Sequence, residues 1–145
     1  MNPYIRHLER ADVPIIVDLG RNVPEFTVDN KHSFWPIDTL DRFVEEGLSF
    51  VVEERANTQI VGFLLAAYQP VTRKLTVEDV YISPNYRRKF LADACFHQSW
   101  SIAKYRGAVM AEALVKIENS PSRKMFERLG FQNVGTYSWM LQFSS

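Results

Sequence analysis

The segment Lys74–Trp100, which reads KLTVEDVYISPNYRRKFLADACFHQSW, indicates most directly how the chain folds. Leu75–Ile82 alternates and is rich in β-branched and aromatic residues, so it predicts a strand. Ser83–Lys89 is a short polar turn that carries three cationic side chains. From Phe90 onward the apolar residues recur at helical spacing, beside a polar face. The segment therefore predicts a strand, a basic turn and a helix.

A strand that enters a helix through such a turn forms an anion site. The first backbone N–H groups of a helix have no partner within the helix, and they lie at the positive end of its dipole. Phosphate is the commonest anion at this position. Arg87, Arg88 and Lys89 would add charge, and the alternative is that they form a solvated basic turn.

Residues 82–92, ISPNYRRKFLA, resemble the pyrophosphate-binding signature of the GNAT superfamily of acyl-CoA-dependent N-acyltransferases. That signature runs Gln/Arg-x-x-Gly-x-Gly/Ala after a strand that ends in an aliphatic residue. Arg87 holds its first position and Ala92 its last, whereas Phe90 stands where the family usually has its first glycine. A side chain there would crowd the pyrophosphate and lose the freedom of glycine at positive φ.

A second stretch, Asn119–Phe131, is similar to the other motif of this superfamily. It reads NSPSRKMFERLGF, against Asn-x-x-Ala-x-x-Leu/Phe-Tyr-Glu-Lys-x-Gly-Phe. Two motifs in the family's order, at a distance that suits it, are more specific than either one. On this basis the chain is identified as a member of the superfamily.

Composition sets the class of protein. A chain of 145 residues is long enough for one domain, expected to span residues 1–145. Seventeen basic and seventeen acidic residues balance, so neither nucleic acid nor a membrane is an expected partner. With no signal pattern and no long apolar run, we expect a cytoplasmic protein. The three histidines have no metal-ligand spacing, and the one cysteine, Cys95, is read as a buried inert thiol rather than a reactive one.

The remaining elements are predicted from periodicity and from helix and turn signals. Asp12 is a candidate cap of the first helix and Gly20 a residue that ends it, and the aromatic-rich segment Arg21–Pro36 is expected to be irregular and to pack over the domain. The expected strands are Tyr4–Leu8, Ser49–Glu54, Gln59–Gln69, Leu75–Ile82, Ala108–Val115 and one or two in Phe131–Phe143, and the helices run to Leu19, over Ile37–Glu46 before Gly47, from Phe90 to Gly107, and from Ser120 to Gly130.

This order predicts an α+β fold of the GNAT type. It has a mixed, mostly antiparallel sheet of six to seven strands, flanked by about four helices. The resemblance implies that Leu75–Ile82 and Ala108–Val115 run parallel and splay apart, so that the wedge between them holds the pantetheine arm of CoA.

The reaction implied by the resemblance is direct transfer of an acetyl group from acetyl-CoA to an amine. A general base contributes about 10²–10⁴-fold, and the backbone N–H near Val80 suits the oxyanion. Glu78 is the first candidate base, because it shares a face with Val80 and Ile82 by period-two counting and lies in a run similar to that of the polyamine acetyltransferases. Asp79 and Glu112 are lesser candidates, and all three could be ordinary exposed or ion-paired acids.

The leaving thiolate has no assigned acid, since Phe126 replaces a tyrosine that many members carry. A thiol pKa of about 8.5 makes such an acid dispensable. Asn119 either binds the pantetheine arm or caps the next helix. The residues expected at the cofactor are Val80, Tyr81, Ile82, Arg87, Arg88, Lys89, Phe90, Leu91, Ala92, Asp93, Asn119 and Phe126.

The acceptor is expected to be a small amine or a peptide amine. Phe26, Phe34 and Trp35 would wall its pocket, and the acids of the neighbouring segments, Glu25, Asp29 and Asp38, would attract its charge. One alternative is a catalytically weakened member that binds CoA or a protein partner in a regulatory or scaffolding role. Another is an interaction domain that does not bind CoA. A homodimer through the last strands, with Tyr137, Trp139 and Phe143, is a further expectation, although these aromatics could equally be core.

Overall fold

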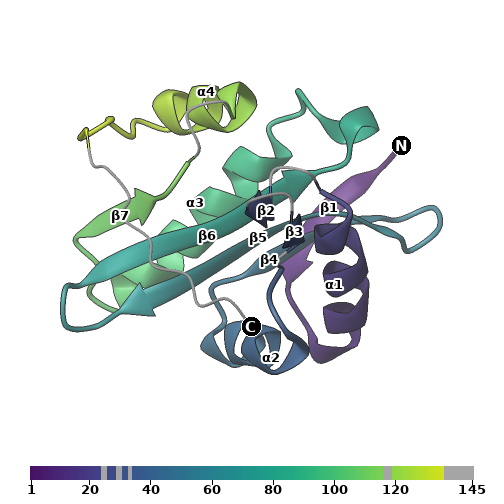
Figure 1. Ribbon diagram of the computed structural model, residues 1–145, viewed down its shortest axis with the longest axis horizontal. Helices are drawn as coiled ribbons and strands as arrows, with labels where there is room; N and C mark the ends of the chain where they lie inside the picture. Colours follow the sequence, from purple (N-terminus) through teal and green to yellow (C-terminus); the bar gives the residue numbers. More distant parts are fainter. Residues whose placement is uncertain (24–25, 29–30, 33, 116–118, 136–145) are drawn as a thin grey trace.

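A five-stranded sheet forms the centre of the computed structural model, which describes residues 1–23, 26–28, 31–32, 34–115 and 119–135 (Figure 1). Its strand order is β1-β4-β5-β6-β7, and only the β6–β7 pair is parallel. The strands are β1 (Pro3–His7), β4 (Phe50–Glu54), β5 (Ile60–Gln69), β6 (Lys74–Ile82) and β7 (Met110–Ala113).

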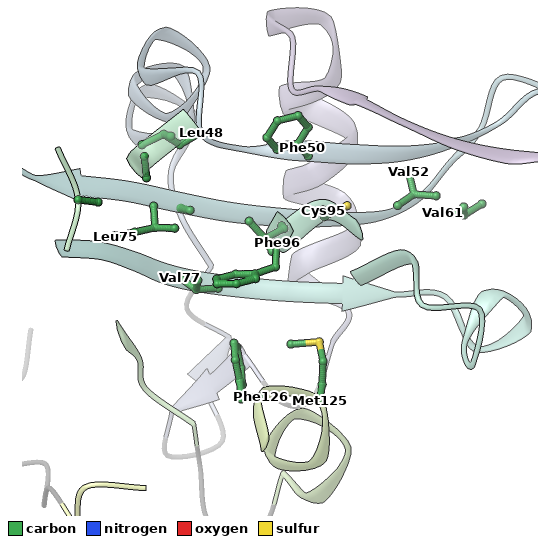
Figure 2. Packing of buried hydrophobic residues seen from close by; sticks show 14 residues of the cluster. Leu48, Phe50, Val52, Val61, Leu75, Val77, Cys95, Phe96, Met125 and Phe126 are labelled. Carbon is green, nitrogen blue, oxygen red and sulfur yellow. The ribbon is translucent and has the colours of Figure 1, made fainter. Parts of the chain in front are cut away.

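Helices cover both faces of the sheet and divide the core in two. The 3-10 turn η1 (Arg10–Asp12) leads into α1 (Val13–Arg21), which packs with α2 (Ile37–Glu46) on one face. A second 3-10 turn, η3 (Pro84–Tyr86), precedes α3 (Leu91–Tyr105), which packs with α4 (Ser120–Arg128) on the other. Figure 2 shows this second core, where Cys95 and Phe96 of α3 and Phe126 of α4 meet the strands.

The predicted architecture is confirmed. The fold is α+β, the described residues form four α-helices and a mixed, mostly antiparallel sheet, and the elements follow the predicted order. This sheet has five strands among the described residues, against the six to seven predicted. The segment expected to be irregular holds one short hairpin, β2 (Thr27–Val28) with β3 (Lys31–His32). Residues 131–135 form no strand, and the rest of the strand predicted over Phe131–Phe143 lies outside the described residues. Within the described ranges, no helix has both the length and the apolar character needed to cross a bilayer.

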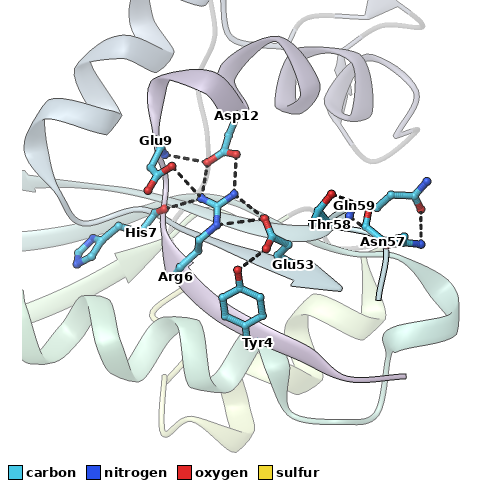
Figure 3. Close-up of polar contacts among 9 residues, drawn as sticks. All are labelled: Tyr4, Arg6, His7, Glu9, Asp12, Glu53, Asn57, Thr58 and Gln59. Atoms are coloured by element: carbon cyan, nitrogen blue, oxygen red, sulfur yellow. Dashed lines mark hydrogen bonds and ion pairs between the residues drawn. The ribbon is translucent and has the colours of Figure 1, made fainter. Parts of the chain in front are cut away.

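Two details of the first helix were predicted wrongly. Asp12 does not cap α1, because its carboxylate accepts a hydrogen bond from the Glu9 amide at 2.8 Å and pairs with both terminal nitrogens of Arg6 at 2.7 and 2.8 Å (Figure 3). Gly20 lies inside α1 rather than ending it. A Cβ atom there would lie 2.4 Å from Cδ1 of Phe34, so this glycine lets the aromatic ring pack directly on the helix.

A β-bulge interrupts β6 at Glu78, the first candidate base. Leu65 pairs with Asp79 and Ala66 pairs with Val77, so Glu78 is an extra residue with no partner on β5. Because of this insertion, Val77 and Val80 both face the α3 side of the sheet. The bulge breaks the alternation between Val77 and Val80, so the period-two count that placed Glu78 with Val80 and Ile82 stays a prediction.

The strands β6 and β7 separate as predicted. Their parallel pairing runs from Lys74 opposite Met110 to Val77 opposite Ala113 and then stops. In Figure 1, β7 turns away from β6 toward α4. Beyond the bulge, β6 stays paired with β5, but among the described residues its opposite edge, on the β7 side, pairs with no strand.

Candidate functional site

The free edge of β6 leads directly into the basic turn. The Nε of Arg87 donates to the Ile82 carbonyl at 2.8 Å and closes the turn on the end of the strand. The turn is also fixed by Tyr86, whose hydroxyl donates to Oε2 of Glu54 at 2.7 Å. Glu54 is only 3% exposed and also accepts from the Asn2 amide at 2.8 Å. The turn is thus attached to the buried part of the sheet, and Arg88 and Lys89 remain exposed.

The N-terminus of α3, with its free amides, directly follows the basic turn. The Ala94 amide donates to the Phe90 carbonyl at 3.0 Å, so Leu91, Ala92 and Asp93 precede the first complete helical turn. Their N–H groups are the unpartnered donors that every α-helix has at this end. They make an anion site of the kind that the sequence predicted.

Phe90 directly precedes α3 and is largely exposed. Its backbone adopts the left-handed conformation, with φ +58° and ψ +27°, which glycine would adopt without strain. The ring is 62% exposed, and the guanidinium of Arg128 lies 5.3 Å from its centroid. Residue 90 thus adopts the conformation that glycine adopts freely, at a cost of about 1–2 kcal/mol.

The second motif supports the corner from α4. Arg128 makes two hydrogen bonds to the Asp93 carboxylate, at 2.9 and 2.7 Å. Asp93 thus offers only its amide to an anion. Oδ1 of Asn119 accepts from the Ser122 amide at 3.3 Å and caps α4, which is one of its two predicted roles. Phe126 is buried, and its ring packs edge-on against Phe131 at 4.9 Å.

Three carboxylates gather around the bulge. Burial raises the pKa of Asp79 to about 6; a hydrogen bond from Nε1 of Trp35 opposes this shift, and the charge of Glu78 adds to it. Burial also raises the pKa of Glu78, with a further contribution from Glu112 of β7. Glu112 is exposed and pairs with Lys74 at 3.1 Å. Asp79, which the sequence ranked below Glu78, accepts a hydrogen bond from the indole N–H of Trp35.

The residues predicted to wall the acceptor pocket lie on the α1–α2 side of β6. The rings of Phe26 and Phe34 are 5.5 Å apart, and both contact Phe63 of β5, which is 5.9 Å from Tyr81. Trp35 reaches past this group to Asp79. The structure therefore brings the predicted acceptor residues and the bulge together.

The other predicted acceptor groups contribute less. Asp38 is exposed in the first turn of α2, where its carboxylate accepts from the Thr39 amide at 3.0 Å. Glu25 and Asp29 lie outside the described residues, as do Tyr137, Trp139 and Phe143.

Cys95 and His97 both lie on α3. Burial raises the pKa of the Cys95 thiol to about 12, and this cysteine is fully buried, as expected of an inert thiol. His97 is exposed on α3. In the part of the chain that the structure describes, no three His, Cys, Asp or Glu side chains are grouped to hold a metal ion.

The comparisons with known sequences point to one family. The model of the acetyltransferase (GNAT) family matches residues 19–131. The streptothricin acetyltransferase of Streptomyces lavendulae is 28% identical over 87 residues, which are 60% of this chain and 46% of that protein. The chain thus aligns with less than half the length of this curated relative.

Solved structures share the fold along almost the whole chain. The structure of AAC(6')-Iy with the bisubstrate analogue CoA-S-monomethyl-acetylneamine matches with a TM-score of 0.75 and 15% identity, over 99% of this chain and 100% of that one. The PaiA N-acetyltransferase of Thermoplasma acidophilum, in complex with coenzyme A, matches with a TM-score of 0.72 and 18% identity, over 94% of each chain. At these identities the likeness concerns the fold.

Proposed function

Because the chain belongs to the acetyltransferase (GNAT) family, we propose that it moves an acetyl group from acetyl-CoA to a primary amine by direct attack. One observation carries the proposal. The edge of β6 becomes free at the bulge, and it ends at a basic turn and at the free amides of α3. An extended thioester would lie along the free strand edge, and the diphosphate at its far end would reach the basic turn and the amides of α3.

Acetyl-CoA would bind along this edge from the bulge to the helix. The amides of Leu91, Ala92 and Asp93 would hold the diphosphate, with charge from Arg87, Arg88 and Lys89. The backbone of Val80, Tyr81 and Ile82 would pair with the pantetheine arm. Asn119 would contribute its amide nitrogen, since its oxygen caps α4. Phe90 and Phe126 would contribute apolar contact only.

Glu78 is the proposed general base. A free alkylamine is mostly protonated at neutral pH, and a carboxylate with a raised pKa removes its proton more readily than an ordinary acid does. The N–H of Val80 would stabilise the oxyanion that forms when the nitrogen attacks the thioester. The thiolate leaves without help from residue 126, because phenylalanine has no hydroxyl.

A small cationic amine is the acceptor that the site favours over a peptide. Glu78, Asp79 and Glu112 provide negative charge beside the aromatic residues Phe34 and Trp35. The names of the relatives, a streptothricin acetyltransferase and aminoglycoside acetyltransferases, agree with an acceptor that carries several amino groups.

The test is release of free thiol from acetyl-CoA in the presence of neamine, streptothricin, a linear diamine or a lysine peptide. We expect turnover with at least one of the three small amines. Glu78→Gln should lower kcat/KM by about 10²–10⁴-fold. Glu127→Gln, at an exposed position on α4, is the control and should not change it. Thermal stabilisation by CoA without turnover on any amine would instead support a CoA-binding module.

A further inference from the structure

Acetylation of a protonated amine removes two protons from one nitrogen. The first must leave before the nitrogen lone pair can attack the carbonyl carbon of the thioester. Attack forms the N–C bond and leaves the nitrogen positively charged, so a second proton must leave. The carbonyl then re-forms, the C–S bond breaks, and its electron pair departs with sulfur as the thiolate. The thiolate takes up one proton, and the other goes to water.

The bulge places two carboxylates next to each other at this point. Glu78 is the inserted residue, and Asp79 pairs with Leu65 in the regular ladder that resumes after it. The proposed base, Glu78, still holds the first proton when the adduct forms. A second carboxylate with a different pKa could accept the second proton while Glu78 is still protonated.

Trp35 determines how Asp79 lies. Its indole packs edge-to-face on Phe43 of α2, with centroids 5.5 Å apart and planes at 80°, and its Nε1 donates to Oδ2 of Asp79. The indole N–H is a donor only and uses one acceptor site of Oδ2, so Oδ1 stays available to accept a proton.

The surroundings of Asp79 contain one nearby charge. Glu78 lies on its own strand, and Glu112 of β7 acts on Glu78. Leu65 faces Asp79 from β5, and Trp35 contacts it from the segment before α2. Among the described residues no cation is recorded as acting on this carboxylate. Its acidity is thus governed by burial and by the indole hydrogen bond.

We propose that Asp79 accepts the second proton of the acceptor nitrogen, and that Trp35 is the positioning residue that orients it through the indole N–H. This inference rests on the proposed acetyl transfer. It assigns to Asp79 a step separate from that of Glu78. It assigns to Trp35 a task beyond that of a pocket wall.

The kinetic test compares pH profiles of kcat/KM for wild type, Trp35→Phe, Asp79→Asn and Trp100→Phe. Wild type should lose activity below about pH 6, in line with the pKa of Asp79. Trp35→Phe removes the donor that favours the charged carboxylate, so this acid limb should move up by about one pH unit. Asp79→Asn should remove the contribution of this carboxyl to the acid limb, leaving that of Glu78, and should lower kcat by about 10²-fold. Trp100→Phe, on α3 against Phe96, is the matched control and should behave like wild type.

A second readout does not depend on turnover. The ¹⁵N-indole NMR signal that is lost in Trp35→Phe should shift with pH in wild type, with a midpoint near 6, and should not titrate in Asp79→Asn. An active enzyme whose acid limb stays in place in Trp35→Phe would overturn the inference alone. A titrating indole in a protein that acetylates no amine would overturn both the proton-transfer role and the proposed function.

Discussion

Phe90 has a backbone conformation that residues with a side chain seldom adopt, and its ring makes little packing contact in return. With φ +58° and an exposed fraction of 62%, it combines strain with solvent exposure. The first residues of α3 follow directly, and their amides precede the first helical hydrogen bond, from Ala94 to the Phe90 carbonyl. We infer that the turn, rather than the ring, is what the site requires of residue 90.

Substitution separates the turn from the ring. Phe90→Gly and Phe90→Ala both remove the contact with Arg128, but only glycine relieves the left-handed backbone. Phe90→Gly should therefore be more stable than Phe90→Ala by about 1 kcal/mol. Urea unfolding at neutral pH measures the difference. Equal stability of the two variants would show that the backbone at this position is not strained.

Asp79 should reduce stability at neutral pH. Its folded pKa is raised from 3.8 to about 6, so its contribution to stability is fully present below the unfolded value and is lost as pH rises through 6. Asparagine stays neutral. Asp79→Asn should therefore gain stability over wild type between pH 4 and 7, up to about 3 kcal/mol.

Urea midpoints across this pH range test the prediction for Asp79. Asp18→Asn, at an exposed position on α1, is the control and should show a difference that does not depend on pH. A constant difference for Asp79→Asn as well would contradict the buried, weakly acidic carboxyl.

Among the elements, β6 shows where sequence reasoning succeeds and where it fails. Its strand character and the helix that follows were predictable, because period-two and helical spacings are local signals, and its parallel neighbour was implied by the family resemblance. The bulge was not predictable, since Glu78 fits an alternating pattern as well as an inserted residue does. It depends on the register with β5, which only the folded sheet reveals.

Long-range contacts account for the other errors. Gly20 suits a helix end, but the ring of Phe34 explains its presence. Asp12 suits a helix cap, but Arg6 binds it instead. The hydrogen bond from Trp35 to Asp79 was also not foreseen, because the two residues are 44 positions apart. Each of these contacts joins two different elements or segments, whereas the order of elements required no such contact.

The basic turn should depend on its attachment to β4. Tyr86→Phe removes the hydroxyl that donates to the buried Glu54 and leaves the ring in place. We expect the KM for acetyl-CoA to rise about fivefold, with little change in the KM for the amine. Tyr105→Phe, at a residue 94% exposed on α3, is the control. A rise in both KM values would instead indicate that the whole domain is perturbed.

In the whole molecule, the two edges of the sheet are built differently. At the β7 edge the pairing ends early and exposes part of β6. At the β1 edge, Arg6 joins Asp12 at the start of α1 to Glu53 of β4, to which it donates at 3.0 Å (Figure 3). Tyr4 donates to the same glutamate. One edge is thus fixed by a nearly buried ion network, while the other remains available for a ligand.

Removal of the central cation should destabilise the protein without altering the site. Arg6→Met leaves Asp12, which is 4% exposed, without its partner, so we expect a loss of about 3 kcal/mol. Arg10→Met breaks an exposed pair with Glu45 and should cost less than about 1 kcal/mol. Urea unfolding compares the two variants. A similar loss in both would contradict the importance assigned to the network.

The bulge has one more consequence, which concerns chain length. Because Leu65 pairs with Asp79 and Ala66 pairs with Val77, a protein that lacked Glu78 would have an uninterrupted ladder, and every later side chain would keep its face of the sheet. Such a shortened chain should fold cooperatively and yet be unable to acetylate. The sheet would then not require Glu78, whereas the proposed chemistry does.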